Sequence, residues 1–404
     1  MKVLYFHQYF TTPEVGGGTR SYEMAIELIR RGHSVTMVCS EIVKLDTSEK
    51  KNNIRRGFID KIDVIQIAIP YSNKDSLVKR TFKFIKFAII GIKIALKEKY
   101  DILFATSTPL TAGIPGIAAK ILRKKTFIFE VRDLWPELPK ALGLKNPFVL
   151  MGMSFLEWLT YQKADACIGL SPGIVEGIKK RSQKGKLIKM IPNGCDLEIF
   201  NPDKRKQLSL DGIKPNDTVA IFTGTHGVAN GLDAVLDAAH YLKNNGREDI
   251  VLCFIGDGKM KQHLIERAKL ENLNNCHFYK PVSKIELAAI VASADIGLMI
   301  LKNVPAFYYG TSPNKYFDYI ASGIPVLNNY PGWLADMINE NQLGIAVAPD
   351  NPEAFAKGLI ELADNKSYRE QAGMNARRFA EANFSREFLA KEFSIFLENV
   401  YKEK

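Results

Sequence analysis

The chain has 404 residues, more than one hydrophobic core usually holds, which predicts two domains. With 46% hydrophobic and 25% charged residues it has the composition of an ordinary soluble protein, not of a disordered or fibrous one. The net charge of +11 favours anionic partners, although charge alone does not separate nucleic acid, lipid headgroups and phosphorylated substrates.

Cysteine usage and the start of the chain indicate the compartment. The five cysteines lie far apart without a C-x-x-C pair, as expected for thiols in a reducing environment. The first apolar segment begins at Lys2, so we expect no cleavable leader and a cytoplasmic protein. The longest apolar stretch is interrupted by Lys86 and Lys93, and we therefore expect no transmembrane helix.

Apolar, β-branched segments alternate with helical patterns along the first half of the chain. Near-continuous apolar strands separated by helices predict a parallel sheet covered on both faces. The expected strands are 2–6, 34–40, 63–69, 101–106, 126–131, 166–170 and 187–192.

Between these strands and a second series lies segment 192–217, which is rich in Pro, Asn, Asp and Lys and predicts a linker. We expect an α/β protein with two doubly wound, Rossmann-like domains, 1–197 and 198–385. A C-terminal helix, 386–404, is expected to pack back on the first domain. Because ligands bind at the carboxyl ends of open sheets, the active site is expected between the domains. The second series of strands is 219–224, 250–256, 276–281, 296–301, 325–329 and 345–349.

Segment Lys79–Lys99 holds seven basic residues against one acid. Its apolar residues recur at helical spacing and its lysines repeat on another face, which predicts a basic amphipathic helix. Such a helix can lie in the interface of an anionic membrane. The alternative is a surface helix that packs its apolar stripe on the sheet, and the sequence leaves both open.

A glycine-rich loop follows the first strand. Gly16, Gly17 and Gly18 precede Arg20 and the first helix, and consecutive glycines let N–H groups approach a phosphate at a helix N-terminus. The pattern is not G-x-G-x-x-G, which disfavours a dinucleotide site. The alternative is a flexible turn.

Loops of the second domain occupy equivalent places. Gly224, Thr225 and His226 follow that domain's first strand and can wrap a diphosphate. Gly256 and Val282 lie where later strands end on the same expected edge, and such loops can hold a flat base. The alternative is again a set of simple strand-to-helix turns.

The segment from Ser312 to Val326 is the most informative of the chain. Ser312, Asn314 and Lys315 suit phosphate, and Asp318 follows about one helical turn after the lysine. This pattern predicts a nucleotide site.

Charges also gather where a first-domain strand ends. Arg132 and Asp133 lie beside Trp135 and are candidates for acceptor binding or acid–base chemistry. The alternative is a structural ion pair. The chain lacks D-x-D, H-E-x-x-H and G-x-S-x-G, so neither a metal site nor a nucleophilic serine is expected.

Segments 16–40, 130–137, 171–174, 191–202 and 312–327 together resemble glycosyltransferase family 4. The resemblance spans nearly the whole chain and implies the GT-B fold and retaining transfer from a nucleotide sugar, without metal or cofactor. It is closest to the branch that builds bacterial O-antigen (lipopolysaccharide), capsule and related cell-surface glycans, often from UDP-linked N-acetylated or deoxyamino sugars.

Three positions depart from the family pattern. Gly310 replaces the first of two glutamates, and Asp318 the second; by resemblance Asp318 binds the ribose. The family's phosphate-binding Arg and Lys are absent from the loop with His226 and Asn230, which leaves Lys315 as the cation for the diphosphate. An Arg–Asp pair, 132–133, stands where His-Asp is frequent.

The resemblance implies a hexosyltransferase that acts on a lipid-diphosphate-linked acceptor at the inner face of the plasma membrane. Lys315, Arg132 and Asp133 are the candidates for the chemistry, the segment Lys79–Lys99 for membrane contact, and no nucleic-acid partner is expected. The alternatives are a UDP-sugar 2-epimerase-like enzyme and a catalytically silent partner of a glycan-assembly complex.

Overall fold

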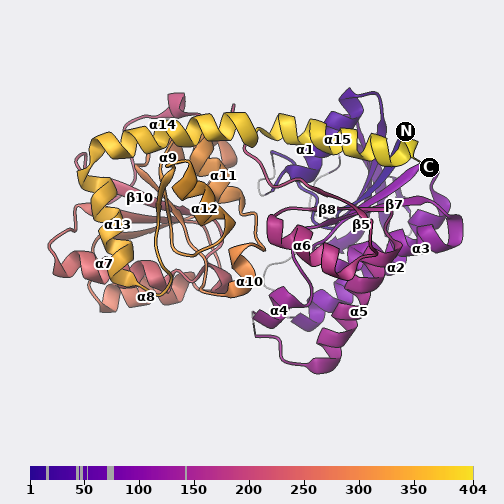
Figure 1. The fold of residues 1–404 in the computed structure, drawn as a ribbon, viewed down its shortest axis with the longest axis horizontal. Helices are drawn as coiled ribbons and strands as arrows, with labels where there is room; N and C mark the ends of the chain where they lie inside the picture. The colour runs from indigo at the N-terminus through magenta and orange to yellow at the C-terminus, as the bar shows by residue number, and fades with distance from the viewer. Residues whose placement is uncertain are drawn as a thin grey trace. The chain divides into compact units, whose positions relative to one another are not determined.

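The computed structural model describes residues 1–14, 18–41, 45, 49–51, 53–70, 77–141 and 143–403. Its contacts divide the chain into two compact units (Figure 1). The N-terminal unit comprises Met1–Pro192, Gly310–Ser312 and Glu387–Lys404, and the C-terminal unit comprises Asn193–Tyr309 and Pro313–Arg386. The boundary expected after residue 197 thus lies a few residues beyond the division after Pro192.

The sheet of the N-terminal unit has, in the described ranges, nine strands in the order β3-β4-β5-β2-β1-β6-β7-β8-β9. From β5 to β9 all neighbours pair in parallel, as the apolar segments predicted. These parallel strands are β1 (Lys2–Phe6), β2 (Ser34–Glu41), β5 (Ile62–Pro70), β6 (Ile102–Thr106), β7 (Thr126–Val131), β8 (Ala166–Gly169) and β9 (Leu187–Met190).

The sequence interpretation missed an antiparallel extension of this sheet. Strands β3 (Glu49–Lys51) and β4 (Ile54–Ile59) pair antiparallel, and β4 pairs antiparallel with β5 through a turn at Asp60, whose φ is 50°. Strand β4 carries two arginines and a glycine, so it lacks the continuous apolar run that marks a strand buried on both faces. The sheet is therefore mixed at this edge.

The sheet of the C-terminal unit has the order β12-β11-β10-β13-β14-β15, and all its strand pairs are parallel. The order reverses between β10 and β13, which makes the loops after these strands the expected ligand crevice. Both units thus have the predicted α/β, Rossmann-like fold. The strands are β10 (Thr218–Thr223), β11 (Ile250–Ile255), β12 (Cys276–Tyr279), β13 (Ile296–Met299), β14 (Val326–Asn328) and β15 (Gly344–Ala346).

Helices cover the sheets. None of the helices in the described part of the chain has the length and apolar character needed to cross a bilayer. In the N-terminal unit they are α1 (Arg20–Arg30), α2 (Leu77–Lys97), η1 (Leu110–Gly113), α3 (Ile114–Arg123), α4 (Glu137–Ala141), α5 (Pro147–Lys163), α6 (Pro172–Arg181) and α15 (Arg386–Lys402). In the C-terminal unit they are η2 (Pro202–Lys204), η3 (Val228–Asn230), α7 (Asp233–Asn244), α8 (Lys261–Leu270), α9 (Lys284–Ser293), α10 (Pro305–Tyr308), α11 (Asn314–Ala321), α12 (Trp333–Glu340), α13 (Pro352–Asp364) and α14 (Lys366–Asn383).

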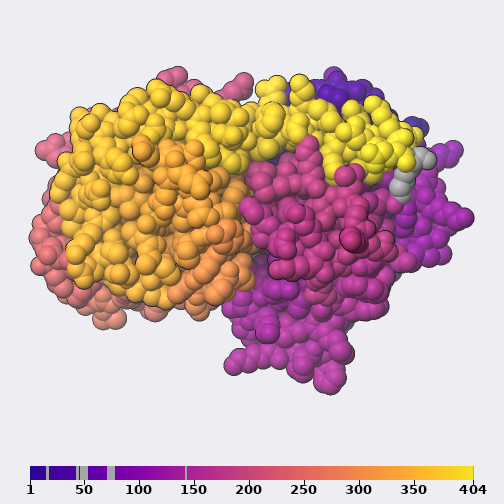
Figure 2. All heavy atoms as spheres, in the orientation of Figure 1, coloured from indigo at the N-terminus to yellow at the C-terminus, as the bar shows by residue number. Residues whose placement is uncertain are grey.

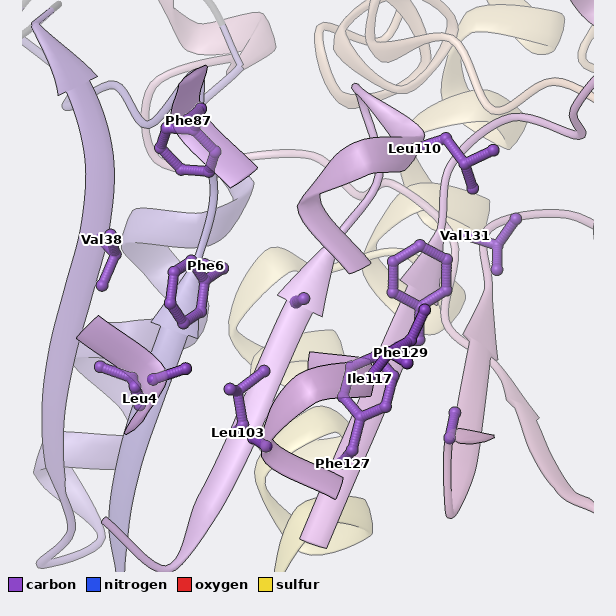
Figure 3. Close-up of a cluster of buried hydrophobic side chains, with 14 of the residues drawn as sticks. Leu4, Phe6, Val38, Phe87, Leu103, Leu110, Ile117, Phe127, Phe129 and Val131 are labelled. Atoms are coloured by element: carbon purple, nitrogen blue, oxygen red, sulfur yellow. The ribbon is translucent and has the colours of Figure 1, made fainter. Parts of the chain in front are cut away.

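Alternate residues of the strands enter two cores in the N-terminal unit. Tyr5 of β1 packs against α1 and α15 on one face, where its ring and that of Phe104 contact Phe393. Phe6 packs against α2 on the other face, where its ring meets Phe87 (Figure 3). This alternation is the period-2 geometry of a strand. It explains why helix α15, at the end of the chain, belongs to the first unit.

Glycine sets the closeness of α3 to the sheet. A β carbon at Gly116 would lie 2.1 Å from the ring of Phe127 in β7, whereas one at Gly152 in α5 would meet nothing within 4 Å. The two helical glycines therefore provide a matched pair.

We expect Gly116→Ala to destabilise the protein by about 1–3 kcal/mol, because the added carbon overpacks the core. Gly152→Ala should stabilise it by up to about 1 kcal/mol, because alanine is the better helix former. Thermal melting of both variants checks this. Equal melting temperatures would mean that α3 does not rest on Phe127.

Candidate functional site

Lys315 lies in the first turn of α11, on the C-terminal unit. Its Nζ donates a hydrogen bond to Oδ1 of Asn230 over 2.9 Å and stands 4.2 Å from the ring centroid of Phe222, the next-to-last residue of β10. The lysine is half-buried. It thus stands where β10 ends, at the edge that carries the expected ligand crevice.

No carboxylate among the described residues lies within ion-pair distance of Lys315. Its ammonium contacts the ring of Phe222 and the neutral amide of Asn230, and both stabilise a cation far less than a counter-ion does. Burial accordingly lowers the pKa of Lys315 to about 7. A half-buried ammonium without a counter-ion is a candidate binding site for an anion.

Asn230 fixes the position of that ammonium. Its Nδ2 donates to the carbonyl of Thr225 over 2.7 Å, so its Oδ1 is turned toward Lys315. The η3 turn that carries Asn230 ends at Gly231, whose φ of 56° suits glycine. The loop after β10 therefore closes on itself and presents one acceptor to the lysine.

The glycines of the two neighbouring loops pack backbone against backbone. A β carbon at Gly256, which follows β11, would lie 1.9 Å from the carbonyl oxygen of Gly224. One at Gly258 would lie 2.4 Å from the carbonyl oxygen of His226, and one at Gly224, whose φ is 120°, would lie 3.6 Å from Cε of Lys315. Because these glycines have no side chains, the predicted residues Gly224 and Gly256 lie close together, and Gly224 lies close to Lys315.

The imidazole of His226 does not lie where the sequence suggested. It is fully buried among the rings of Phe222, Phe254 and Phe278, and neither ring nitrogen has a hydrogen-bond partner in the described structure. Burial, with help from Lys261, lowers the pKa of His226 to about 4, so the ring is neutral near pH 7. As placed, His226 packs the loop, while Thr225 is exposed.

Asp318 lies one turn after Lys315 on α11 and is half-buried. Burial raises the pKa of Asp318 to about 6, although Arg386 and Lys284 act in the opposite direction. Lys284 follows the half-buried Val282 at the start of α9 and pairs with Asp196 over 3.3 Å. Of the remaining predicted residues, Asn314 is exposed at the first position of α11 and Ser312 is half-buried before it.

Arg20, predicted for the phosphate loop, is buried in the N-terminal unit. Its Nε and an NH group donate to Glu130 over 3.0 and 2.8 Å, and its other bonds reach the carbonyls of Ile191 and Pro192. Its guanidinium therefore ties α1 to β7 and to the end of the first unit. In the same loop Gly18 is exposed, whereas Gly16 and Gly17 lie outside the described residues.

Arg132 and Asp133 follow β7 but do not pair as the structural alternative proposed. Arg132 Nε donates to Thr106 over 2.8 Å and to the buried Glu130 over 3.2 Å, and Asp133 accepts from Thr108 over 3.1 Å. Burial acts to raise the pKa of Glu130, but Arg20 and Arg132 together lower it. Burial raises the pKa of Asp133.

A pocket of about 330 Å³ lies at the crevice of the C-terminal unit, between the loops after β10 and β13. Gly227 and Gly231 line one side, and the start of α7 lies beside them. Sequence analysis did not name its polar lining. The polar residues are Asp233, Asp237, Lys302, Asn303, Asn329 and Asp350.

Three residues that sequence reasoning left without a role support the site. Phe222 belongs to an apolar strand and carries no signal of its cation contact. Asn230 stands in a loop already noted, but only the fold shows which way its amide points. Glu130 is the next-to-last residue of the predicted strand 126–131 and was grouped with Arg132, whereas its bond to Arg20 joins residues far apart in sequence.

Two family models match the chain, one after the other. The model described as Glycosyltransferase Family 4 matches residues 15–199, and the model described as Glycosyl transferases group 1 matches residues 203–379. Together they account for most of the chain and confirm the resemblance. The chain belongs to glycosyltransferase family 4 and is a glycosyltransferase of the GT-B fold class.

Among curated relatives, a D-inositol 3-phosphate glycosyltransferase of Paenarthrobacter aurescens is 30% identical over 208 residues. This match spans about half of either chain, 48% of each. The N-acetylgalactosamine-N,N'-diacetylbacillosaminyl-diphospho-undecaprenol 4-alpha-N-acetylgalactosaminyltransferase of Campylobacter jejuni is 22% identical over 264 residues, 62% of this chain and 66% of the relative.

Solved structures share the fold over the full length. Sucrose-phosphate synthase from Thermosynechococcus elongatus has a TM-score of 0.78 at 17% identity and covers 100% of both chains. Anabaena HepE in complex with UDP-glucose has a TM-score of 0.68 at 14% identity and covers 99% of this chain and 100% of HepE. At these identities the likeness is one of fold.

Replacing Lys315 with Met should raise the melting temperature of the ligand-free protein by a few degrees. The folded pKa of Lys315, about 7, lies below the ordinary 10.5, so the unfolded chain binds the additional proton between these values. Lys315 therefore costs stability fully below pH 7, and the cost fades as the pH rises toward 10.5.

The gain should accordingly be largest at acidic pH, as measured by melting curves across a pH series. Lys366, an exposed lysine of α14 in the same unit, provides the control variant Lys366→Met, which should show no such trend. A gain that is independent of pH would contradict the burial of an unpaired ammonium.

Proposed function

We propose that this glycosyltransferase moves a sugar, an N-acetylated or deoxyamino hexose, from a UDP-sugar to a lipid-diphosphate-linked acceptor, with retention of configuration. The observation that carries the proposal is Lys315, a half-buried ammonium with no carboxylate within ion-pair distance in the described structure. A diphosphate is the anion whose charge and size suit that site. The role belongs to the synthesis of a cell-surface polysaccharide such as O-antigen or capsule.

In this proposal the donor's leaving group rests on the C-terminal unit. The ammonium of Lys315 neutralises the charge that develops as the glycosidic bond breaks. Gly224, beside the lysine, has no side chain to come between its backbone and the diphosphate, and Gly256 packs against the carbonyl of Gly224. Asp318, one turn further along α11, accepts hydrogen bonds from the ribose hydroxyls. The leaving phosphate takes the acceptor's proton, so neither a metal nor a cofactor enters the reaction.

The acceptor is assigned to the N-terminal unit, at the residues that follow β7. Arg132 is held by Thr106, Glu130 and Ser21, and Asp133 by Thr108, so both side chains are fixed before a ligand arrives. Fixed polar groups at a strand end orient a hydroxyl nucleophile at little entropic cost. Arg132 also suits the diphosphate of a lipid-linked acceptor.

The relatives support each half of this proposal by name. HepE was solved with UDP-glucose, and the enzyme of Campylobacter jejuni is named for a diphospho-undecaprenol acceptor. A lipid-linked acceptor places the reaction at the membrane's inner face. Helix α2 suits that location, since it holds six basic residues and no acid, with Lys86, Lys93 and Lys97 exposed.

A catalytically silent binding partner is the second candidate. Gly310 stands in the place of a family glutamate, and His226 and Asn230 occupy the loop that elsewhere in the family carries phosphate-binding cations. A silent protein would bind the nucleotide sugar without turning it over. A measurement of turnover therefore separates the two candidates, whereas a measurement of nucleotide-sugar binding does not.

Binding of fragments separates the two halves of the donor site. Lys315→Met should weaken binding of UDP about tenfold or more, because a charge-assisted contact is lost, and leave binding of uridine unchanged. Asp318→Ala should weaken UDP and uridine alike. Titration calorimetry measures each pair. If Lys315→Met weakens uridine as strongly as UDP, the lysine does not hold the diphosphate.

Transfer itself is tested with a panel of UDP-sugars and a polyprenyl-diphosphate-linked N-acetylhexosamine. We expect one donor to be consumed with release of UDP, and proton NMR of the product to show the anomeric configuration of the donor. Lys315→Met should lower the rate about a hundredfold or more, the effect of removing one electrostatic stabiliser of a transition state. Donor binding without release of UDP or formation of product would establish the silent partner.

A further inference from the structure

Helix α5 of the N-terminal unit exposes a stripe of large apolar side chains. Phe148, Met151, Phe155 and Trp158 recur at spacings of three and four residues, which places them along one side of the helix. Their exposed fractions are 77%, 65%, 59% and 43%, and the rings of Phe155 and Trp158 lie 5.8 Å apart. A continuous apolar ridge of this size marks an interaction surface.

The N-terminal half of α5 does not contribute to the core. The buried residues of the helix are Glu157, Thr160 and Tyr161, all in its C-terminal half. From Lys145 to Glu157 the sequence carries no intervening charge, and the helix start is fixed by Asn146, whose side chain accepts from the N–H groups of Phe148 and Val149. A well-capped helix thus projects uncharged surface into solvent, and Figures 1 and 2 show α5 projecting from the N-terminal unit.

Topology places the start of α5 at the same edge of the sheet as the start of α2. Helices α2 and α5 each follow a parallel strand and lead to the next one, so both begin at the carboxyl edge of the sheet, with α3 packed between them. The first half of α2 also exposes an apolar stripe with heptad spacing, formed by Val78, Phe82, Ile85 and Ile89. The same edge carries Arg132 and Asp133 directly after β7.

We propose that the α5 ridge, formed by Phe148, Met151, Phe155 and Trp158, inserts into the interface of an anionic bilayer together with the first half of α2. The bilayer then lies against the carboxyl edge of the first sheet. This inference rests on the proposed function, since a lipid-linked acceptor requires a membrane, and it adds the element that enters the apolar layer.

Charge selects the bilayer over a second copy of the chain. Helix α2 carries basic residues and no acid, so a two-fold interface through this edge would bring lysines against lysines. An anionic lipid surface instead complements them, while the uncharged start of α5 suits the acyl boundary. Lys83 is half-buried, and its Nζ donates to the carbonyl of Pro70 over 2.6 Å.

The test measures binding of the full chain to vesicles of phosphatidylglycerol and phosphatidylcholine by co-sedimentation. The double variant Phe148→Ser with Phe155→Ser should bind the vesicles at least about tenfold more weakly than the natural protein, at low and at high salt. The matched control replaces Leu270 and Ile285 with Ser, two exposed apolar residues of the C-terminal unit, and should bind as the natural protein does. Circular dichroism and melting curves verify that each variant folds.

A second arm tests the charge contribution and keeps the two proposals apart. Replacing Lys79 and Lys86, the exposed lysines in the first half of α2, with Gln should weaken binding at low salt and have little effect at high salt. If the α5 variant binds vesicles as the natural protein does while the lysine variant loses binding, the α5 inference is overturned and the proposed function is left intact. Absence of vesicle binding by the natural protein would overturn both membrane assignments, while transfer to a short, water-soluble acceptor would still test the enzyme.

Trp158 reports insertion directly. Brominated lipids should quench its fluorescence in the bound protein, and Trp158→Phe should remove most of that quenching, because Trp135 and Trp333 lie elsewhere and are less exposed. Unquenched Trp158, or a dimer in light scattering that the α5 variant abolishes, would contradict the inference and identify the ridge as a contact between copies of the chain.

Discussion

In the described structure, Lys315 of the C-terminal unit has no carboxylate within ion-pair distance. Lys315 stands between the ring of Phe222 and the amide of Asn230, and burial holds its pKa near 7. A protein tolerates such a group only where a ligand supplies the missing charge or where other interactions offset the cost. The glycines of the adjoining loops pack backbone against backbone beside it, and the proposed donor site is built on that arrangement.

The two units solve the same problem in different ways. In the first unit the charges at the strand ends are already satisfied: Glu130 is bound by Arg20 and Arg132. That network holds Arg132, while Asp133 accepts a separate hydrogen bond from Thr108. In the second unit, the ammonium of Lys315 at the corresponding edge has no carboxylate within ion-pair distance in the described structure. In the proposed function, the held polar groups of the first unit orient the acceptor, and the charge of the donor's diphosphate stabilises Lys315.

The proposed lipid-linked acceptor requires contact with a membrane, which neither sheet provides. The lysines of α2 attract an anionic surface over a distance set by salt, whereas the aromatic residues of α5 act only on contact. Charge therefore governs approach and apolar burial governs residence. Because both helices begin at the carboxyl edge of the first sheet, their contacts with lipid would bring the bilayer to the same edge as Arg132 and Asp133.

The sequence by itself determined the parallel strands of the two sheets and the place of Lys315 and Asp318 one turn apart on a helix, because strand periodicity and a helical turn are local properties. Its motifs also indicated the family. Tertiary structure alone decided which polar groups are available. His226 lies inward because Phe222, Phe254 and Phe278 come from three different strands or strand ends, and Arg20 lies inward because Glu130 and Pro192 meet it from distant parts of the chain. The β3–β4 extension escaped notice because an edge strand is not apolar on both faces. Burial depends on contacts between residues far apart in sequence, and a pattern read along the chain does not contain them.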